Sequence, residues 1–344
     1  IFDGLFNDYS IEVVNDKLVI EDNRSGTPNG ITTLENIEIV EFSDLDKTTN
    51  ELLENFYTIT QSNYAADDLN IIDASTSIII NASAIISLTG LASDILNAYE
   101  SSGINGLGNA TLTISDISID ASLLNILDLN TTGIINASTI TNITGSSSEI
   151  NNAISSEGIS NLENKKITIF DSSIDASLLN TINEKTTGII NLIALTSLTG
   201  SASDIFNAYE SSGISGLGNE IITISDSSID ASLLNTINEK IPGIINLIAL
   251  TSLNGISSDI FNAYESSGIS GLGNEIITIS DSSIDASFLN TLDEKTTGII
   301  NASAVTNLSG DFSALNAAYL SSNIDGLGNE IITISDSSID ASFL

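Results

Sequence analysis

The sequence predicts an α/β solenoid, in which short strands and helices stack coil upon coil around a parallel sheet. Three observations lead to this fold class. The sequence repeats without gaps every 55 residues, each repeat alternates β-rich and helix-forming segments, and a unit this small cannot bury a core by itself. An all-β solenoid, in which the helical segments are turns and short strands, is the alternative. The period is marked by one glycine per repeat: Gly90, Gly145, Gly200, Gly255 and Gly310.

The repeats divide the chain into a short leading module, residues 1–50, and a long array, residues 51–344. The array contains five full copies and the beginning of a sixth. The full copies are residues 57–111, 112–166, 167–221, 222–276 and 277–331, and the partial copy is 332–344. Because the chain begins and ends abruptly, without an initiating Met, we expect it to be a segment of a longer polypeptide.

The leading module has the pattern of a small antiparallel sheet. Apolar and polar residues alternate in 9–15 and again in 18–21, which predicts a hairpin. A loop rich in turn-forming residues follows at 22–30, and the alternation at 34–42 predicts a third strand. We expect this sheet to cover the open end of the array, where an apolar face and an unpaired strand edge would otherwise meet water.

Each repeat is expected to form two strand–helix coils of about 27 residues. In the fourth copy, residues 221–224 predict the first strand, and residues 233–240 predict a short helix that Pro242-Gly243 ends. The second coil is expected to have a strand at 248–253 and a helix at 258–265, with Gly268 as its C-terminal stop. In other copies the second helix begins with a capping box, such as Ser146 with Glu149, although Leu91 and Ile256 replace that serine.

Composition limits the possible functions. The chain has 45 acidic and 8 basic residues, a net charge of −37, so it lacks the cationic surface that nucleic acids and anionic membranes require. The apolar runs are too short to span a bilayer. His and Cys are both absent, which excludes Ser–His and Cys–His catalysis and His-ligated zinc. Carboxylates recur periodically instead of forming one cleft, and we therefore expect no enzyme.

Pairs of aspartates in the pattern D-S-S-I-D form the main candidate for a binding site. Aspartate is a common turn and N-cap residue, which gives one interpretation of the pairs. The other is calcium: successive members of the column would lie roughly 10 Å apart if two coils separated them, and a divalent cation would relieve their repulsion. The candidate ligands are Asp116, Asp120, Asp171, Asp175, Asp226, Asp230, Asp281, Asp285, Asp336 and Asp340. A weaker candidate of the same kind comprises Asp22, Asn23, Asn29, Asp44 and Asp46.

Two further columns are expected to be structural. One asparagine follows an apolar pair in every first coil, and we expect it to satisfy backbone groups that would otherwise be buried unpaired. Its members are Asn70, Asn125, Asn180, Asn235 and Asn290. The G-L-G-N corner at 216–219 lacks the Lys-Ser/Thr of a phosphate-binding loop, so we expect a turn that needs positive φ.

The leading module resembles a module found beside calcium-binding nonapeptide (RTX) repeats in type I secreted bacterial proteins. The matching features are the N-D-Y-S-I strand, the D-N-R-S-G-T-P-N-G loop and the T-L-E-N-I-E-I-V-E-F-S-D ending, over about 40 residues. The nonapeptides themselves, G-G-x-G-x-D, are absent from this chain. Calcium binding by that mechanism is therefore not implied.

The repeats resemble long repeats of giant cell-surface proteins of marine cyanobacteria, the group linked to swimming motility. The shared phrases are T-S-L-T-G-S-A-S-D-I-F-N-A-Y, G-I-S-G-L-G-N-E and D-A-S-L-L-N-T-I-N-E-K-T-T-G-I-I-N, within about 290 residues of this chain. The resemblance implies export and a place outside the outer membrane.

Together these features predict a structural protein of the bacterial cell exterior. It would be a surface-layer or filament component that assembles with copies of itself, with calcium as a stabilising ion and surface polysaccharide as a further partner. Two alternatives stay open at this point: an adhesin stalk that carries a distal binding domain, and the non-catalytic tail of a secreted hydrolase.

Overall fold

The computed structural model describes residues 8–14, 17–25, 31–34, 39–41, 46–48 and 57–338. The chain divides into two compact units, residues 1–167 and residues 168–344. Each unit is treated by itself below.

The leading module forms a small antiparallel sheet, as predicted. Strand β1 (Tyr9–Val14) pairs with β2 (Lys17–Asp22), and β2 pairs with β3 (Ile31–Leu34). The predicted third strand at 34–42 is wrong in its position, because the sheet uses Ile31–Leu34 and a separate strand β4 (Ile39–Glu41) pairs with β5 (Asp46–Thr48). The predicted boundary at residue 50 lies outside the described residues.

Short strands and helices then alternate through the rest of the first unit. The strands are β6 (Asn63–Ala65), β7 (Ile80–Asn81), β8 (Ser87–Gly90), β9 (Ile104–Asn105), β10 (Thr111–Ile114), β11 (Ser118–Asp120), β12 (Ile135–Asn136), β13 (Asn142–Gly145) and β14 (Ile159–Ser160). The helices are α2 (Ala66–Ser75), α3 (Ala92–Glu100), α4 (Ala121–Asn130) and α5 (Ser147–Ser155). Strand β15 (Lys166–Ile169) contains the division between the units.

The second unit repeats the same order of elements. Its strands are β16 (Ser173–Asp175), β17 (Ile190–Leu192), β18 (Ser197–Gly200), β19 (Ile214–Ser215), β20 (Ile221–Ile224), β21 (Ser228–Asp230), β22 (Ile245–Asn246), β23 (Ser252–Gly255), β24 (Ile269–Ser270), β25 (Ile276–Ile279), β26 (Ser283–Asp285), β27 (Ile300–Asn301), β28 (Asn307–Gly310), β29 (Ile324–Asp325) and β30 (Ile331–Ile334). Its helices are α6 (Ala176–Lys185), α7 (Ala202–Glu210), α8 (Ala231–Lys240), α9 (Ser257–Glu265), α10 (Ala286–Lys295) and α11 (Phe312–Leu320).

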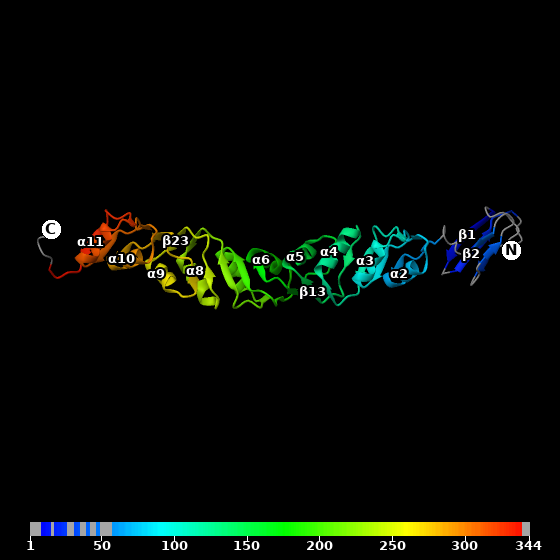
Figure 1. The fold of residues 1–344 in the computed structure, drawn as a ribbon, viewed down its shortest axis with the longest axis horizontal. Coiled ribbons are helices and arrows are strands. Elements are labelled where there is room, and N and C mark those ends of the chain that lie inside the picture. The colour runs from blue at the N-terminus through cyan, green and yellow to red at the C-terminus, as the bar shows by residue number, and fades with distance from the viewer. Residues whose placement is uncertain are drawn as a thin grey trace. The chain divides into compact units, whose positions relative to one another are not determined.

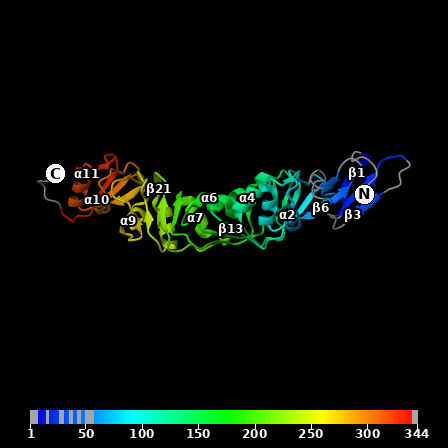
Figure 2. The ribbon, with the colours of Figure 1, turned by 45° about the vertical axis from the view of Figure 1, so that its right-hand side comes forward.

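The predicted α/β solenoid is confirmed within each unit. In the first unit the strands β14-β12-β10-β8-β6 form one sheet, and the pairs within it are parallel. In the second unit the parallel sheets are β16-β18-β20-β22-β24, β21-β23-β25-β27-β29 and β26-β28-β30. Each helix packs against the next along the chain, as α8 does against α9 and α10 against α11 (Figure 1). Figure 2 shows the strands of this unit as arrows lying side by side near β21.

The predicted coil of about 27 residues is wrong. Ser228 pairs with Ser252, and Ser252 pairs with Ile276, so one coil takes 24 residues. Two coils therefore leave seven residues of the 55-residue repeat over. The chain uses them to begin a new strand: β20 starts at Ile221, and β21 starts seven residues later at Ser228 and belongs to the next sheet. Successive sheets are therefore staggered, each starting before the previous one ends.

Two local predictions in the second coil also need correction. The predicted strand at 248–253 is two short strands, β22 and β23, separated by a turn that exposes 80% of Ile248. Gly268 does not end helix α9 through a left-handed φ, because its φ is not positive. It is small because a Cβ there would lie 2.3 Å from the Asn238 side-chain oxygen.

Buried Ile and Leu side chains form the core, and small residues set the distance between coils. Leu234, Ile237 and Ile260 are fully or almost fully buried under the helices. The marker glycine lies at a close approach: Gly255 has a φ of 151°, and a Cβ there would lie 3.2 Å from the Ala231 Cβ of the neighbouring coil. An alanine at the helix start and a glycine at the strand end therefore allow adjacent coils to touch.

Candidate functional site

The second aspartate of each D-S-S-I-D pair caps the helix that follows it. Asp230 is the N-cap of α8, and its carboxylate accepts hydrogen bonds from the backbone N–H groups of Ser232 (2.9 Å) and Leu233 (3.4 Å). Asp120, Asp175 and Asp285 bind the equivalent N–H groups at 2.9–3.0 Å. These bonds satisfy donors that a helix leaves unpaired at its first turn.

The first aspartate of each pair caps a different helix, one coil earlier. The Oδ2 atom of Asp226 accepts from the N–H of Ala202, the first residue of α7, at 2.7 Å and across 24 residues. Asp281 does the same to Ser257 of α9 at 2.7 Å. Asp116 and Asp336 bind the first residues of α3 and α11 at 2.7 and 2.6 Å. One D-S-S-I-D segment therefore holds the starts of two consecutive helices.

Negative charge at these positions suits the helix ends. An N-terminus carries partial positive charge, so a carboxylate there is stabilised. The pKa of Asp230 lies below its ordinary value of 3.8, chiefly because the Ser232 hydroxyl donates to the carboxylate, with further help from the Ser232 and Leu233 N–H groups. The contacts on the page correspond to the turn-and-cap interpretation of the aspartates.

The geometric argument for a calcium row is wrong. We expected equivalent aspartates to lie about two coils apart in one line. The sheet instead places Asp230 beside Asn254, and Asn254 beside Thr278, seven residues before Asp285. The stagger of the sheets is the reason. In the described parts of the chain, no group of three or more His, Cys, Asp or Glu residues could hold a metal ion. Calcium binding stays a prediction.

The remaining candidate ligands are placed less completely. Asp171 occupies the position in its repeat that Asp226 has in the next one. Asp340 lies outside the described residues, as do Asn29 and Asp44 of the weaker candidate. Asp22 of that candidate is engaged within the leading module, where the structure shows its partners.

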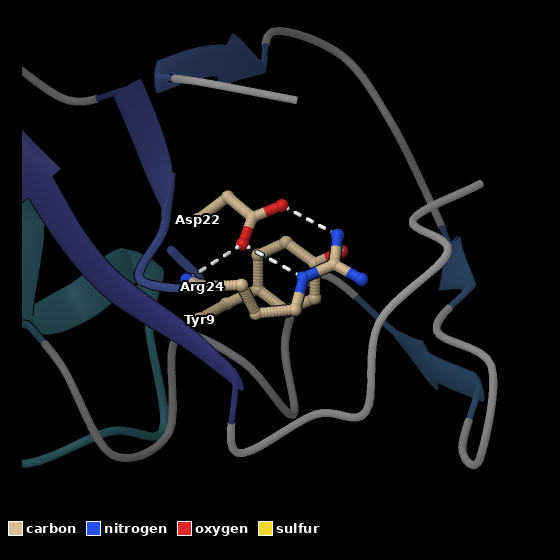
Figure 3. Close-up of polar contacts among 3 residues, drawn as sticks. All are labelled: Tyr9, Asp22 and Arg24. Carbon is tan, nitrogen blue, oxygen red and sulfur yellow. Dashed lines mark hydrogen bonds and ion pairs between the residues drawn. The ribbon is translucent and has the colours of Figure 1, made fainter. Parts of the chain in front are cut away.

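Asp22 forms an ion pair with Arg24 beneath a tyrosine ring. Its side chain has no exposed area, and its two oxygens accept from the Arg24 guanidinium at 2.9 and 2.6 Å. The guanidinium also lies 5.4 Å from the centre of the Tyr9 ring and donates to the Tyr9 hydroxyl at 3.1 Å (Figure 3). This cluster closes the end of the β1–β2 hairpin and so has a structural role.

The asparagine column binds backbone, as predicted. The side-chain amide of Asn235 donates to the backbone oxygen of Asp259 in the next helix at 2.9 Å. The same bond occurs in every full repeat, from Asn70, Asn125, Asn180 and Asn290, at 2.8–3.0 Å. Each of these amides ties a first-coil helix to the first turn of the following helix.

The corner glycines have the positive φ that the sequence predicts. Gly216 has a φ of 96° and Gly271 of 100°, and the second repeat places Asn161 there with a φ of 68°. Asparagine tolerates this conformation better than other residues with a side chain. A shallow groove of about 530 Å³ lies at one such corner, lined by residues 216–221 together with Leu195 and Thr196.

A buried carboxylate at each later corner is a feature that the sequence analysis missed. Glu275 is 1% exposed, accepts from the N–H groups of Gly273 and Asn274 at 2.8 and 3.0 Å, and accepts from the Tyr264 hydroxyl. Glu220 and Tyr209 form the same pair. Burial, and then the neighbouring Glu275, raises the pKa of Tyr264 far above its ordinary value.

Covariation between repeats contains the signal for this pair. Where the tyrosine position is Ile154, the carboxylate position is Lys165, whose ammonium donates to the Ser138 backbone oxygen at 3.1 Å. Where the carboxylate is replaced by Ala110, Tyr99 donates instead to the Leu107 backbone oxygen at 2.8 Å. The two positions therefore change together across the copies.

Taken together, these polar groups are committed to the fold. Carboxylates cap helices, amides bridge them, and the buried glutamates fasten corners. Comparison with protein families, with curated proteins and with solved structures found no match. None of the helices in the described ranges has the length and hydrophobicity of a membrane span.

Proposed function

We propose that this chain is a structural component of the bacterial cell exterior, part of a surface layer or an extracellular filament. One observation supports the proposal above the others: the polar side chains that catalysis or ligand binding would use instead make the same backbone contacts in repeat after repeat. A repeated scaffold suits a repeated assembly. The net charge of −37 suits solubility in salt water.

Exposed isoleucines supply a surface for assembly between copies. Ile244 and Ile299 occupy the same place in successive repeats and are 53% and 42% exposed. Ile221 and Ile276 are 52% and 50% exposed. The Ile222 N–H donates to the Ile244 oxygen, so Ile221 and Ile244 are neighbours on adjacent strands. Contiguous exposed apolar surface is typical of interaction sites, and its periodicity matches that of a second copy.

The proposal is tested by electron microscopy of the purified chain. We expect ordered sheets or fibres from the parent protein, and fewer or none from a double variant, Ile244→Asp with Ile299→Asp. The matched control is Ile248→Ser, which removes an equally exposed isoleucine and installs the residue found at that position in other repeats, such as Ser303. Immunogold labelling of source cells adds the location. Dispersed parent protein, together with label confined to the cell interior, would refute the proposal.

Calcium is proposed as the stabilising ion of the assembly. Thermal unfolding with calcium and with chelator gives the test, and magnesium is the control for general screening of the acidic surface. A calcium-specific rise in the melting midpoint supports the proposal. Equal midpoints in all three conditions would leave the aspartates with capping alone.

A further inference from the structure

One glycine position in the repeat reports whether another coil lies beneath it. In the segment T-T-G-I-I-N, a Cβ on Gly298 would lie 2.0 Å from the backbone oxygen of Glu275 in the preceding coil. For Gly243 the distance to the Glu220 oxygen would be 2.3 Å, and for Gly133 the distance to the Ala110 oxygen would be 2.2 Å. Real Cβ atoms do not approach backbone this closely, so only glycine fits above a coil of this kind.

The first repeat breaks this rule with Ile78. The local backbone is nevertheless the same. The Ile78 N–H donates to the Thr76 hydroxyl at 3.1 Å, as Gly298 donates to Thr296 at 2.9 Å. Downstream, Ile80 donates to the backbone oxygen of the following coil just as its counterparts do. The Ile78 Cβ therefore points where the Gly298 Cβ would, toward the carbonyl of any coil stacked below.

We propose that Ile78 closes the first coil, so that no coil with the path of this repeat stacks on that side. The occupant excluded is a second copy of this chain. Residues 326–338 are identical in sequence to residues 271–283, which in the interior carry the coil that contains Gly298. Those residues of one copy would otherwise fit under Ile80–Asn81 of another.

The segment that occupies this position is short. Thr58 pairs with Asn81 in one isolated bridge, with hydrogen bonds of 3.0 Å from Ile59 to Asn81 and from Asn81 to Tyr57. Tyr57 and Ile332 stand at the same place in the repeat. The closure by Ile78 therefore adds a steric block where hydrogen bonding alone would be easily exchanged. This inference concerns the ends of coils and does not depend on the proposed function.

Two variants of the full chain test the block. Ile59→Pro removes the N–H that bonds Asn81, and the double variant Ile59→Pro with Ile78→Gly also removes the proposed obstacle. Sedimentation equilibrium over a range of concentrations gives the average mass, with circular dichroism as the check on folding. We expect Ile59→Pro to keep the parent mass, and the double variant to gain mass with concentration by end-to-end association. Association of Ile59→Pro alone would overturn the proposal, as would a folded double variant whose mass equals that of Ile59→Pro.

A third comparison tests the steric basis inside the array. Gly298→Ile places the first coil's residue above Glu275, and we expect loss of the folded signal or a large fall in the melting midpoint. Gly218→Ile is the matched control, because a Cβ at Gly218 meets nothing within 4 Å. Equal melting curves for the two variants would show that the glycine position tolerates a side chain and would overturn the proposal.

Discussion

At the residue scale, the aspartate pair D-S-S-I-D does the most to organise this chain. One member caps the helix that follows, and the other reaches one coil back to cap the helix before. Sequence patterns predict the first role, because Asp directly before a helix is a familiar signal. They do not predict the second, because a bond across 24 residues depends on the register of the coils. The calcium row failed as an argument for the same reason.

Removing the cross-coil cap should destabilise the array measurably. Asp226→Ala takes the acceptor away from the Ala202 N–H, and the loss of an N-cap acceptor costs about 1 kcal/mol. We expect a lower melting midpoint in a calorimeter. Asp226→Asn keeps an acceptor oxygen and serves as the control. If the alanine variant melts with the parent, the bond at 2.7 Å contributes nothing to stability.

The helix caps also predict how stability depends on pH. The folded state lowers the pKa of Asp230, so its contribution is present above its ordinary value of 3.8 and is lost as the pH falls from there through the folded pKa. Ser232→Ala removes the main cause of the lowered pKa. We expect denaturant midpoints of this variant to fall less than those of the parent between pH 6 and pH 3. Parallel pH profiles would contradict the assignment.

The corner tyrosines give an optical prediction. Burial and the adjacent carboxylates raise the pKa of Tyr209 and Tyr264, so their stabilising contribution persists below the ordinary value of 10.0 and is lost only as the pH rises beyond it. Absorbance titration of the folded chain should therefore show later ionisation than titration in denaturant. Tyr264→Phe should remove part of the late component, and an unchanged titration would contradict the pairing with Glu275.

At the element scale, the helices are short and are kept in place by neighbours. Helices of nine or ten residues do not persist alone in water. Their existence and positions could be predicted from the period, because Asp230 and the apolar spacing repeat faithfully. The end signal at Gly268 was misassigned, since a contact with Asn238 in another coil, not the local chain, requires glycine there.

A missing cap offers a way to stabilise one helix. Helix α9 begins after Ile256, which is 45% exposed and makes no side-chain cap, although Asp259 stands where a capping box needs an acid. Ile256→Ser would recreate the arrangement of Ser201 with Asp204 in α7. We expect a gain of about 0.5–1 kcal/mol, measured as a higher melting midpoint. Ile256→Ala controls for loss of the isoleucine, and equal midpoints for the two would rule out the cap.

At the scale of the whole molecule, the repeat explains both what could and what could not be predicted. The 55-residue period, the strand at 221–224 and the parallel sheets follow from hydrophobic pattern and from the small size of each unit. The stagger of the sheets could not be read from that period, because pattern alone does not show how many residues one coil consumes. The exposed isoleucines and the acidic charge belong to the assembly that we propose.

The coil length of 24 residues underlies every contact described, and cysteine cross-linking tests it directly. The chain contains no cysteine, so pairs can be introduced without background. Ser228→Cys with Ser252→Cys places thiols on paired neighbours, whose Cα separation of about 5 Å suits a disulfide. Ser228→Cys with Ser283→Cys joins the same position of successive repeats. The account predicts rapid intramolecular oxidation of the first pair and none of the second, and the reverse result would contradict it.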